Sequence, residues 1–289
     1  YTSMIRIKQK HRRLENRLYM AEKMSAHAAL LGIRNYEQGK LDRAMQDLLF
    51  CEFHDILPGS CIRPGEERAL MTLDHGLEEA ETVRYDSFMS MLVGQPAAKE
   101  GDLPIFVYNP HPYPVDTVMN VEYQMPVSNW DKKFTISHLF DENGNEILSQ
   151  AEMPTSNLAI DWRKNTCFVA HLNPAGITRF DCRFSRVDKQ PRPTMQPADG
   201  YYTVVTDRMV VKINASTGLV DSYMVDGVEQ VENDAFCPLV IKDTADSWGM
   251  NSTEFRQVVG RFSCMSQEDA DAYSGFVYNS MPAVRVVEE

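Results

Sequence analysis

The sequence predicts an α+β multidomain protein, in which an N-terminal three-helix bundle is followed by an antiparallel, β-sandwich-like region. Apolar side chains recur at helical spacing towards Met91, whereas short β-branched and aromatic runs between turn residues follow Pro96. The charge divides at the same boundary, since residues 1–96 hold 13 basic and 14 acidic side chains of a chain whose net charge is −12. We therefore expect a helical domain over 1–96 and an acidic, β-rich domain over 97–289.

Three helices are expected, over 4–31, 40–54 and 64–91. The first stretch has no glycine or proline before Gly32, and the third begins at a proline that suits a first helical turn. In the second, Leu41, Met45 and Leu48 recur at i, i+4 and i+7, which predicts that they form its buried face. Short connections between the helices favour an antiparallel bundle.

Turn residues organise the region beyond residue 96. The run Glu142-Asn143-Gly144-Asn145 between apolar segments predicts a β-hairpin, because Asn-Gly readily adopts positive φ. The segment 188–200 contains three prolines, which are excluded from central strands, so we expect it to link two β subdomains. Similar turns are expected at 216–218 and 226–227.

Composition excludes several classes of protein. No apolar run approaches the roughly 18 residues of a membrane span, and the negative charge disfavours nucleic acid and anionic membrane surfaces as partners. The six cysteines are scattered and form no CxxC pair, which favours a reducing, cytoplasmic setting. The sequons at Asn214 and Asn251 match glycosylation acceptors, but nothing else indicates secretion.

The densest group of reactive side chains lies between Cys51 and Cys61, where His54 and Asp55 precede a Pro-Gly break. An imidazole beside a carboxylate suits metal ligation or substrate binding. Two alternatives stay open: His54 caps the carbonyls of a last helical turn, or it shares a zinc ion with Cys51 and Cys61. Ser60 and Cys61 lack a base at the spacing that a nucleophile needs.

Residues 41–60, LDRAMQDLLFCEFHDILPGS, resemble the helix-to-loop signature of the bacterial α-mannosidases of glycoside hydrolase family 38. Residues 1–22 look like the stretch by which these enzymes pass from their catalytic domain into a helical bundle. FVYNPHPYP, VVKINASTGLVDS and PLVIKDTADSW are similar to segments of the family's C-terminal β domains. The resemblance covers essentially the whole chain and is strongest over 1–62.

The resemblance implies a part of a zinc-dependent, retaining α-mannosidase that acts on α-mannosides or oligosaccharides. His54 would be one zinc ligand in a set of two histidines and two aspartates, and Asp55 would hydrogen-bond a sugar hydroxyl in the −1 subsite. The zinc would hold the 2- and 3-hydroxyls of mannose as the ring distorts towards an oxocarbenium-like state. In the family the other ligands include a His-x-Asp pair in an N-terminal domain, and no such pair occurs here.

We therefore expect a fragment that is inactive alone and whose partner in cis is the missing catalytic domain. Asp246 and Trp248, with Asp243, are further candidates for lining the sugar site, although loop aspartates and packed tryptophans are more often structural. The basic run from Arg6 to Arg13 is interpreted as a solvated helix face or as a surface that docks the catalytic domain. A homodimer stays open.

A second hypothesis assigns residues 97–289 to a non-catalytic carbohydrate-binding or domain-docking β module, with the helices as a spacer. The two hypotheses differ in what should precede this segment. An upstream stretch that contains His-x-Asp favours the enzyme, and its absence favours the binding module.

Overall fold

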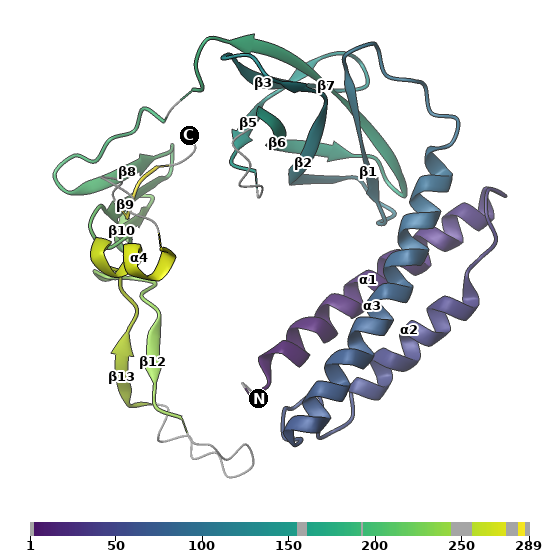
Figure 1. Cartoon of the computed structure of the whole chain (residues 1–289), viewed down its shortest axis with the longest axis horizontal. Coiled ribbons are helices and arrows are strands. Elements are labelled where there is room, and N and C mark those ends of the chain that lie inside the picture. Colours follow the sequence, from purple (N-terminus) through teal and green to yellow (C-terminus); the bar gives the residue numbers. More distant parts are fainter. Residues whose placement is uncertain (1–2, 155–160, 192, 244–255, 276–282, 287–289) are drawn as a thin grey trace.

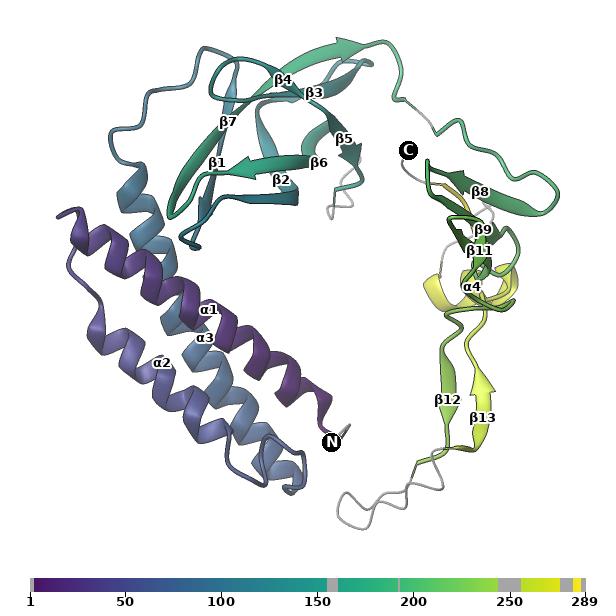
Figure 2. The same ribbon diagram turned by 180° about the vertical axis from the view of Figure 1, so that it is seen from behind.

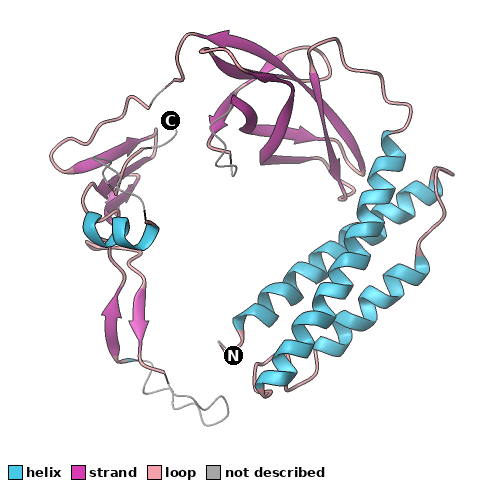
Figure 3. Ribbon diagram, in the orientation of Figure 1, coloured by secondary structure: helices cyan, strands magenta, loops and turns pink. Residues whose placement is uncertain are grey.

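A computed structural model describes residues 3–154, 161–191, 193–243, 256–275 and 283–286. Figure 1 shows these residues along an open arc, with a helical bundle, a β-sandwich and a second β unit in chain order. Three of the helices precede all the strands, and the sheets are antiparallel (Figure 3). The predicted α+β class is thereby confirmed.

The bundle consists of α1 (Ile5–Leu30), α2 (Gln38–Cys51) and α3 (Arg63–Leu92). Both α1 and α2 pack along α3, and the three lie side by side in Figures 1 and 2. Helix α3 opens with Pro64 in its first turn, as the sequence predicts. The buried core shared by the helices is mainly aliphatic and comprises Ile7, Leu14, Leu18, Ala21, Leu41, Ala44, Leu48, Cys51, Ile56, Ala69, Leu73, Leu77, Ala80 and Val83.

The buried face of α2 is not the predicted one. Leu41 and Leu48 are buried, but the residue between them on this face is Ala44, whereas Met45 is 40% exposed. A spacing of i, i+3, i+7 and i+10 continues this face to Cys51. An alanine at the helix contact lets the helix backbones approach closely. With Ala44 on the buried face, α2 is rotated about its axis so that Met45 is turned towards solvent.

Gly76 permits a close approach between helices of the bundle. It is buried inside α3, and a Cβ at this position would lie 2.8 Å from Cδ2 of Leu14 and 3.1 Å from Cβ of Asp47. We expect Gly76→Val to lower the free energy of unfolding by about 1–3 kcal/mol, because the side chain overpacks a filled core. Chemical denaturation measures this change.

Gly39 provides a matched control for that substitution. It is also helical, but the nearest atom to its added Cβ is a flexible Arg43 nitrogen at 3.6 Å. Gly39→Val should therefore change stability by less than about 0.5 kcal/mol, as for other surface positions. Equal losses at both positions would show that packing against Leu14 does not decide the result.

The β-sandwich has two antiparallel sheets. One has the order β1 (Leu103–Asn109), β7 (Gly176–Val187), β3 (Phe134–Phe140) and β4 (Glu146–Ile147), and the other β2 (Val115–Asn129), β6 (Asp161–Leu172) and β5 (Ser149–Glu152). Alternate residues of both sheets enclose one core, which contains Ile105, Leu139, Phe168, Ala170, Leu172, Phe180 and Cys182.

The hairpin predicted at 142–145 joins β3 to β4. The backbone N–H of Asp141 donates to the carbonyl of Asn145 at 2.9 Å, and Gly144 adopts a φ of +83°. The expected positive φ therefore falls on the glycine of the Asn-Gly pair.

The bundle joins the sandwich through a small apolar contact. Met24, Ala28 and Met91 from the ends of α1 and α3 pack with Tyr108 of β1 and Ile177 of β7. The Tyr108 hydroxyl also lies 3.1 Å from Nδ1 of His27. This contact fixes one end of the bundle and leaves its other end, where α2 meets α3, away from the sandwich (Figure 1).

The second β unit follows segment 188–200, in which the described residues form only an isolated bridge. Its four-stranded sheet has the order β11 (Val228–Glu229), β10 (Val220–Val225), β9 (Met209–Asn214) and β8 (Tyr201–Val205), and a two-stranded sheet joins β12 (Leu239–Ile241) to β13 (Val258–Arg261). Helix α4 (Gln267–Ser274) lies beside the larger sheet in Figures 1 and 2. Among its described residues, Tyr202 alone is buried, so this unit has little hydrophobic core of its own.

Candidate functional site

The loop that connects α2 to α3 presents His54 and Asp55. Helix α2 ends at Cys51, and the chain continues in tight turns, in which Ile56 N–H donates to the Phe53 carbonyl at 2.8 Å. Ile56 is buried in the bundle core and anchors the middle of the loop. His54 therefore lies three residues beyond the helix end, so the open alternative of a last-turn capping histidine does not describe it.

The start of the chain is pinned against the same loop. Gly59 has a φ of +85°, and a Cβ there would lie 2.6 Å from the carbonyl oxygen of Ser3. The Ser3 hydroxyl donates to the Gly59 carbonyl at 2.9 Å, and the Cys61 thiol lies 3.4 Å from the sulfur of Met4. The glycine is thus required by both conformation and close approach. Sequence reasoning missed this contact, because Ser3 and Gly59 are far apart in the chain.

The His54 side chain points into solvent. It is 74% exposed, its Nε2 lies 3.5 Å from Oδ2 of Asp55, and its ring centroid lies 4.2 Å from that of Phe53. The imidazole is thus accessible from solvent just beyond the end of α2. An exposed imidazole is available as a ligand or as a hydrogen-bonding group.

Ser60 makes two hydrogen bonds to Asp55. The Asp55 side chain is 34% exposed, its Oδ1 accepts a hydrogen bond from the Ser60 hydroxyl at 3.2 Å, and its carbonyl accepts from Ser60 N–H at 3.2 Å. Ser60 therefore orients the carboxylate of Asp55. The other oxygen, Oδ2, faces His54.

The open alternative of a zinc ion shared with Cys51 and Cys61 is not supported. Cys51 is buried inside the bundle, where its thiol contacts the Ala69 carbonyl at 3.7 Å, and burial raises its pKa to about 11. Burial also raises the pKa of Cys61. Zinc binds thiolates, which these environments disfavour. Within the described ranges, no three His, Cys, Asp or Glu side chains are grouped to hold a metal ion.

The basic run at the start of α1 is mostly neutralised within the bundle. Arg6 pairs with Glu66 of α3 at 2.9 Å, Lys10 pairs with Asp74 of α3, and Arg12 pairs with Glu15 of α1 itself at 2.8 Å. This pattern agrees with the solvated-face interpretation. A depression of about 450 Å³ over Gln9, Arg12, Arg13, Asn16 and Arg17 lies on the same helix.

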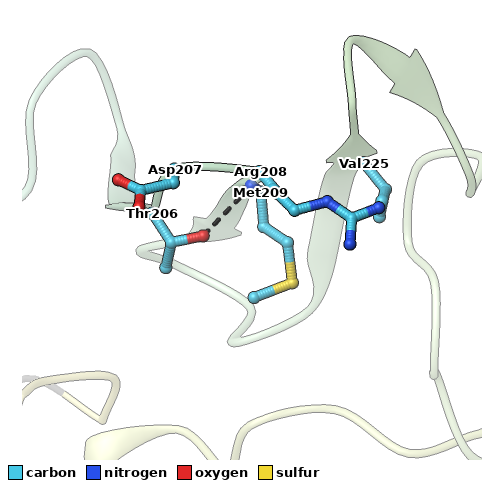
Figure 4. Close-up of a pocket in the computed structure, with 5 residues that line it drawn as sticks. All are labelled: Thr206, Asp207, Arg208, Met209 and Val225. Atoms are coloured by element: carbon cyan, nitrogen blue, oxygen red, sulfur yellow. Dashed lines mark hydrogen bonds between the residues drawn. The ribbon is translucent and has the colours of Figure 1, made fainter.

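The remaining sequence candidates are less well placed. Asp246 and Trp248 lie outside the described residues, and Asp243 lies just beyond the end of β12. A cavity of about 560 Å³ in the same unit is lined by Thr206, Asp207, Arg208, Met209 and Val225. In Figure 4 the Thr206 hydroxyl accepts a hydrogen bond from the backbone of Met209 at 3.1 Å. Among the described residues, this lining includes no aromatic ring for a sugar face and no imidazole for a metal.

A line of three polar side chains crosses the outer face of the sandwich and was not expected from the sequence. His138 on β3 lies 2.9 Å from Oε1 of Glu146 on β4 and 2.8 Å from the hydroxyl of Ser185 on β7. The distances match those of a Ser-His-Glu triad, but Glu146 is 58% exposed. Such a solvated pair ties neighbouring strands together and does not form an enclosed site.

Comparisons with known proteins point to one family. Residues 1–91 match the alpha mannosidase middle domain family. A curated α-mannosidase of Saccharomyces cerevisiae is 23% identical over 141 residues, which are 48% of this chain and 13% of the yeast protein.

Two solved structures from Enterococcus faecalis share the fold. One is an α-mannosidase with 14% identity and the other a protein of glycosyl hydrolase family 38 with 13% identity, and both have a TM-score of 0.60. They match 86% and 90% of this chain, which covers 31% and 33% of theirs. The chain thus spans about a third of these relatives. In the part of the chain that the structure describes, no helix is long and apolar enough to cross a membrane. Residues 1–91 are thus similar to an α-mannosidase middle domain, and the fold over most of the chain resembles that of two solved proteins, an α-mannosidase and a member of glycosyl hydrolase family 38.

Proposed function

We propose that this chain is part of a zinc-dependent, retaining α-mannosidase, in which His54 is a metal ligand and Asp55 binds the sugar. One observation carries the proposal: the two side chains lie on an exposed loop at the free end of a matched middle domain. If these two side chains were buried or paired within the bundle, they could not reach a substrate.

His54 and Asp55 supply part of what a zinc site needs. An exposed imidazole is a good zinc donor, and a neighbouring carboxylate can orient it. A zinc site needs three or four such donors, and the described residues do not group a set of that size. We therefore propose that the remaining ligands, the nucleophile and the acid/base belong to another domain of the same polypeptide, and that this chain is inactive alone.

The contribution of the chain itself is to position polar groups. Ser60 holds one oxygen of Asp55, which leaves the other beside His54 and able to accept a hydrogen bond from a sugar hydroxyl. A zinc ion, when bound, would supply Lewis-acid binding of substrate hydroxyls. The expected ligand is an α-mannoside or an oligosaccharide, in line with mannose metabolism. A cytoplasmic setting is proposed from the six free cysteines.

An assay of the complete polypeptide with an aryl α-mannoside tests this proposal. We expect hydrolysis that a chelator abolishes and added zinc restores, with no turnover by the 289-residue chain. The substrate must be cleaved with retention at the anomeric carbon, which NMR of the first-formed sugar reports. Chelator-resistant hydrolysis or inversion would refute the zinc or the retaining part of the proposal, respectively.

A further inference from the structure

The three-stranded sheet of β2, β6 and β5 carries two glutamates that the proposed function does not use. Glu122 of β2 pairs with Asn165 of β6, and Asn165 pairs in turn with Glu152 of β5. Directly paired residues of neighbouring strands stand side by side on one face of a sheet, with Cβ atoms about 5 Å apart. Glu122, Asn165 and Glu152 therefore form one row, named here the outer-face row, with the amide between the two carboxylates.

The alternation of β6 places the outer-face row on the side away from the sandwich core. The hydroxyl of Thr166, the residue after Asn165, lies 2.9 Å from the hydroxyl of Tyr123, and Phe168 belongs to that core. Successive side chains of a strand point to opposite faces, so Asn165 points outward. Arg163, two residues before it on the same face, is 43% exposed.

Asn165 differs from its neighbours on this face because it is only 9% exposed. Its side-chain oxygen is buried and accepts no hydrogen bond from any described residue. An ionised glutamate has no proton to donate, so neither flanking carboxylate can satisfy this oxygen. A buried acceptor without a partner is unfavourable, and in a native protein it points to a bound water or ion.

Neighbours on the same face hold the two glutamates beside this oxygen. The side-chain amide of Asn120 donates to Oε2 of Glu152, and Nη1 of Arg163 donates to Oε1 of Glu122 at 3.1 Å. Arg163 balances one of the two negative charges and leaves the other in surplus. A carboxylate has about four lone-pair sites, so each glutamate can bind a cation and keep its present hydrogen bond.

We propose that the outer-face row is a calcium site. Its protein ligands are Oδ1 of Asn165 and a carboxylate oxygen from each of Glu122 and Glu152, which are the oxygen ligands that calcium prefers. A cation satisfies the amide oxygen and the surplus negative charge together, whereas a neutral hydroxyl group would satisfy only the oxygen. A single ion also reaches a buried oxygen that a sugar ring cannot reach.

The geometry of the row favours calcium over magnesium. Three side chains on a sheet approach an ion from one side, and calcium tolerates such an irregular set, with waters as the remaining ligands. Magnesium demands a nearly ideal octahedron. The outer-face row shares no residue with the proposed zinc site, so zinc content and mannosidase activity do not bear on this inference.

Titration calorimetry of the chelator-treated 289-residue chain with calcium chloride tests the proposal. We expect one site with a Kd of about 10⁻⁴–10⁻³ M, since only two of its ligands are charged. Saturating calcium should also raise the melting temperature by at least about 2 °C, because the ion binds the folded sheet alone. Absence of calcium binding by a folded chain, or tighter binding of magnesium chloride, would overturn the proposal.

Glu152→Gln removes one charged ligand and keeps the shape of the side chain, so the Kd should rise at least about tenfold. Asp116→Asn is the matched control, because Asp116 is a carboxylate on the same face of β2 that pairs with His171 at 2.6 Å, outside the row. Its Kd should equal that of the unsubstituted chain. An unchanged Kd in Glu152→Gln, or an equal loss in both variants, would contradict the assignment.

Asn165→Leu separates ligation from a structural role of the amide. Leucine has the branching of asparagine without its oxygen, and this oxygen makes no hydrogen bond to the described residues that the sheet would lose. The melting temperature without calcium should therefore not fall, and calcium should no longer raise it. A lower melting temperature together with an undiminished calcium effect would show that the amide serves only the sheet, and would refute the site.

Discussion

Replacing His54 with alanine in the complete polypeptide should remove bound zinc and α-mannosidase activity together. The loss should be at least about 100-fold in activity at limiting zinc, since even groups that merely orient metal ligands are worth about 10- to 100-fold. His54 is exposed and makes no contact that the bundle needs for folding, so the melting temperature of the 289-residue chain should not fall. Zinc is measured by mass spectrometry of the purified protein, and activity with an aryl α-mannoside.

His75→Ala is the matched control for this substitution. His75 is a half-exposed histidine of the same bundle and also lies beside an aspartate, with Nδ1 2.6 Å from Asp47. Hydrogen bonding to Asp47 raises the pKa of His75, which is typical of a structural ion pair. Zinc content and turnover should stay unchanged in this control. Unchanged zinc in His54→Ala would show that His54 is not a ligand.

The second large effect is expected from Asp55→Asn, which should lower kcat by about 10- to 100-fold, the worth of one hydrogen bond to a charged acceptor. The amide keeps the shape of the carboxylate and one acceptor oxygen for Ser60, so the loop should keep its conformation. Zinc should stay bound. The two variants separate a substrate-binding role from metal ligation. His54→Ala should lose both bound zinc and turnover, whereas Asp55→Asn should lose turnover alone.

Asp47→Asn serves as the control for that variant. Asp47 is an aspartate of the same bundle that pairs with His75 and lies away from the loop. Full turnover in Asp55→Asn would show that Asp55 is only a structural neighbour of His54. Loss of zinc in the same variant would instead make Asp55 part of the metal site.

The helices of the bundle could be predicted from sequence because local signals decide them. Pro64 and the glycine-free run up to Leu31 place the ends of α1 and α3 within a residue or two. The rotation of α2 could not be predicted, since Ala44 and Met45 both satisfy a helical period and only the packing against the other helices chooses between them.

Other features depend on distant contacts or on signals that were overlooked. The pairing of β1 with β7 joins Leu103 to Cys182, and no local pattern encodes such a register. Helix α4 was missed although Ser266 caps it by accepting a hydrogen bond from Asp269 N–H, a local signal that the sequence displays. His54 and Asp55 could be found because a single loop presents both, whereas the contact of Ser3 with Gly59 exists only in the folded bundle.

Diffraction from crystals of the complete polypeptide, measured on either side of the zinc absorption edge, tests the central claim most directly. The account predicts an anomalous peak within bonding distance of a ring nitrogen of His54, with further ligands supplied by another domain of the same polypeptide. A zinc peak remote from His54, with this imidazole still exposed to solvent, would contradict it.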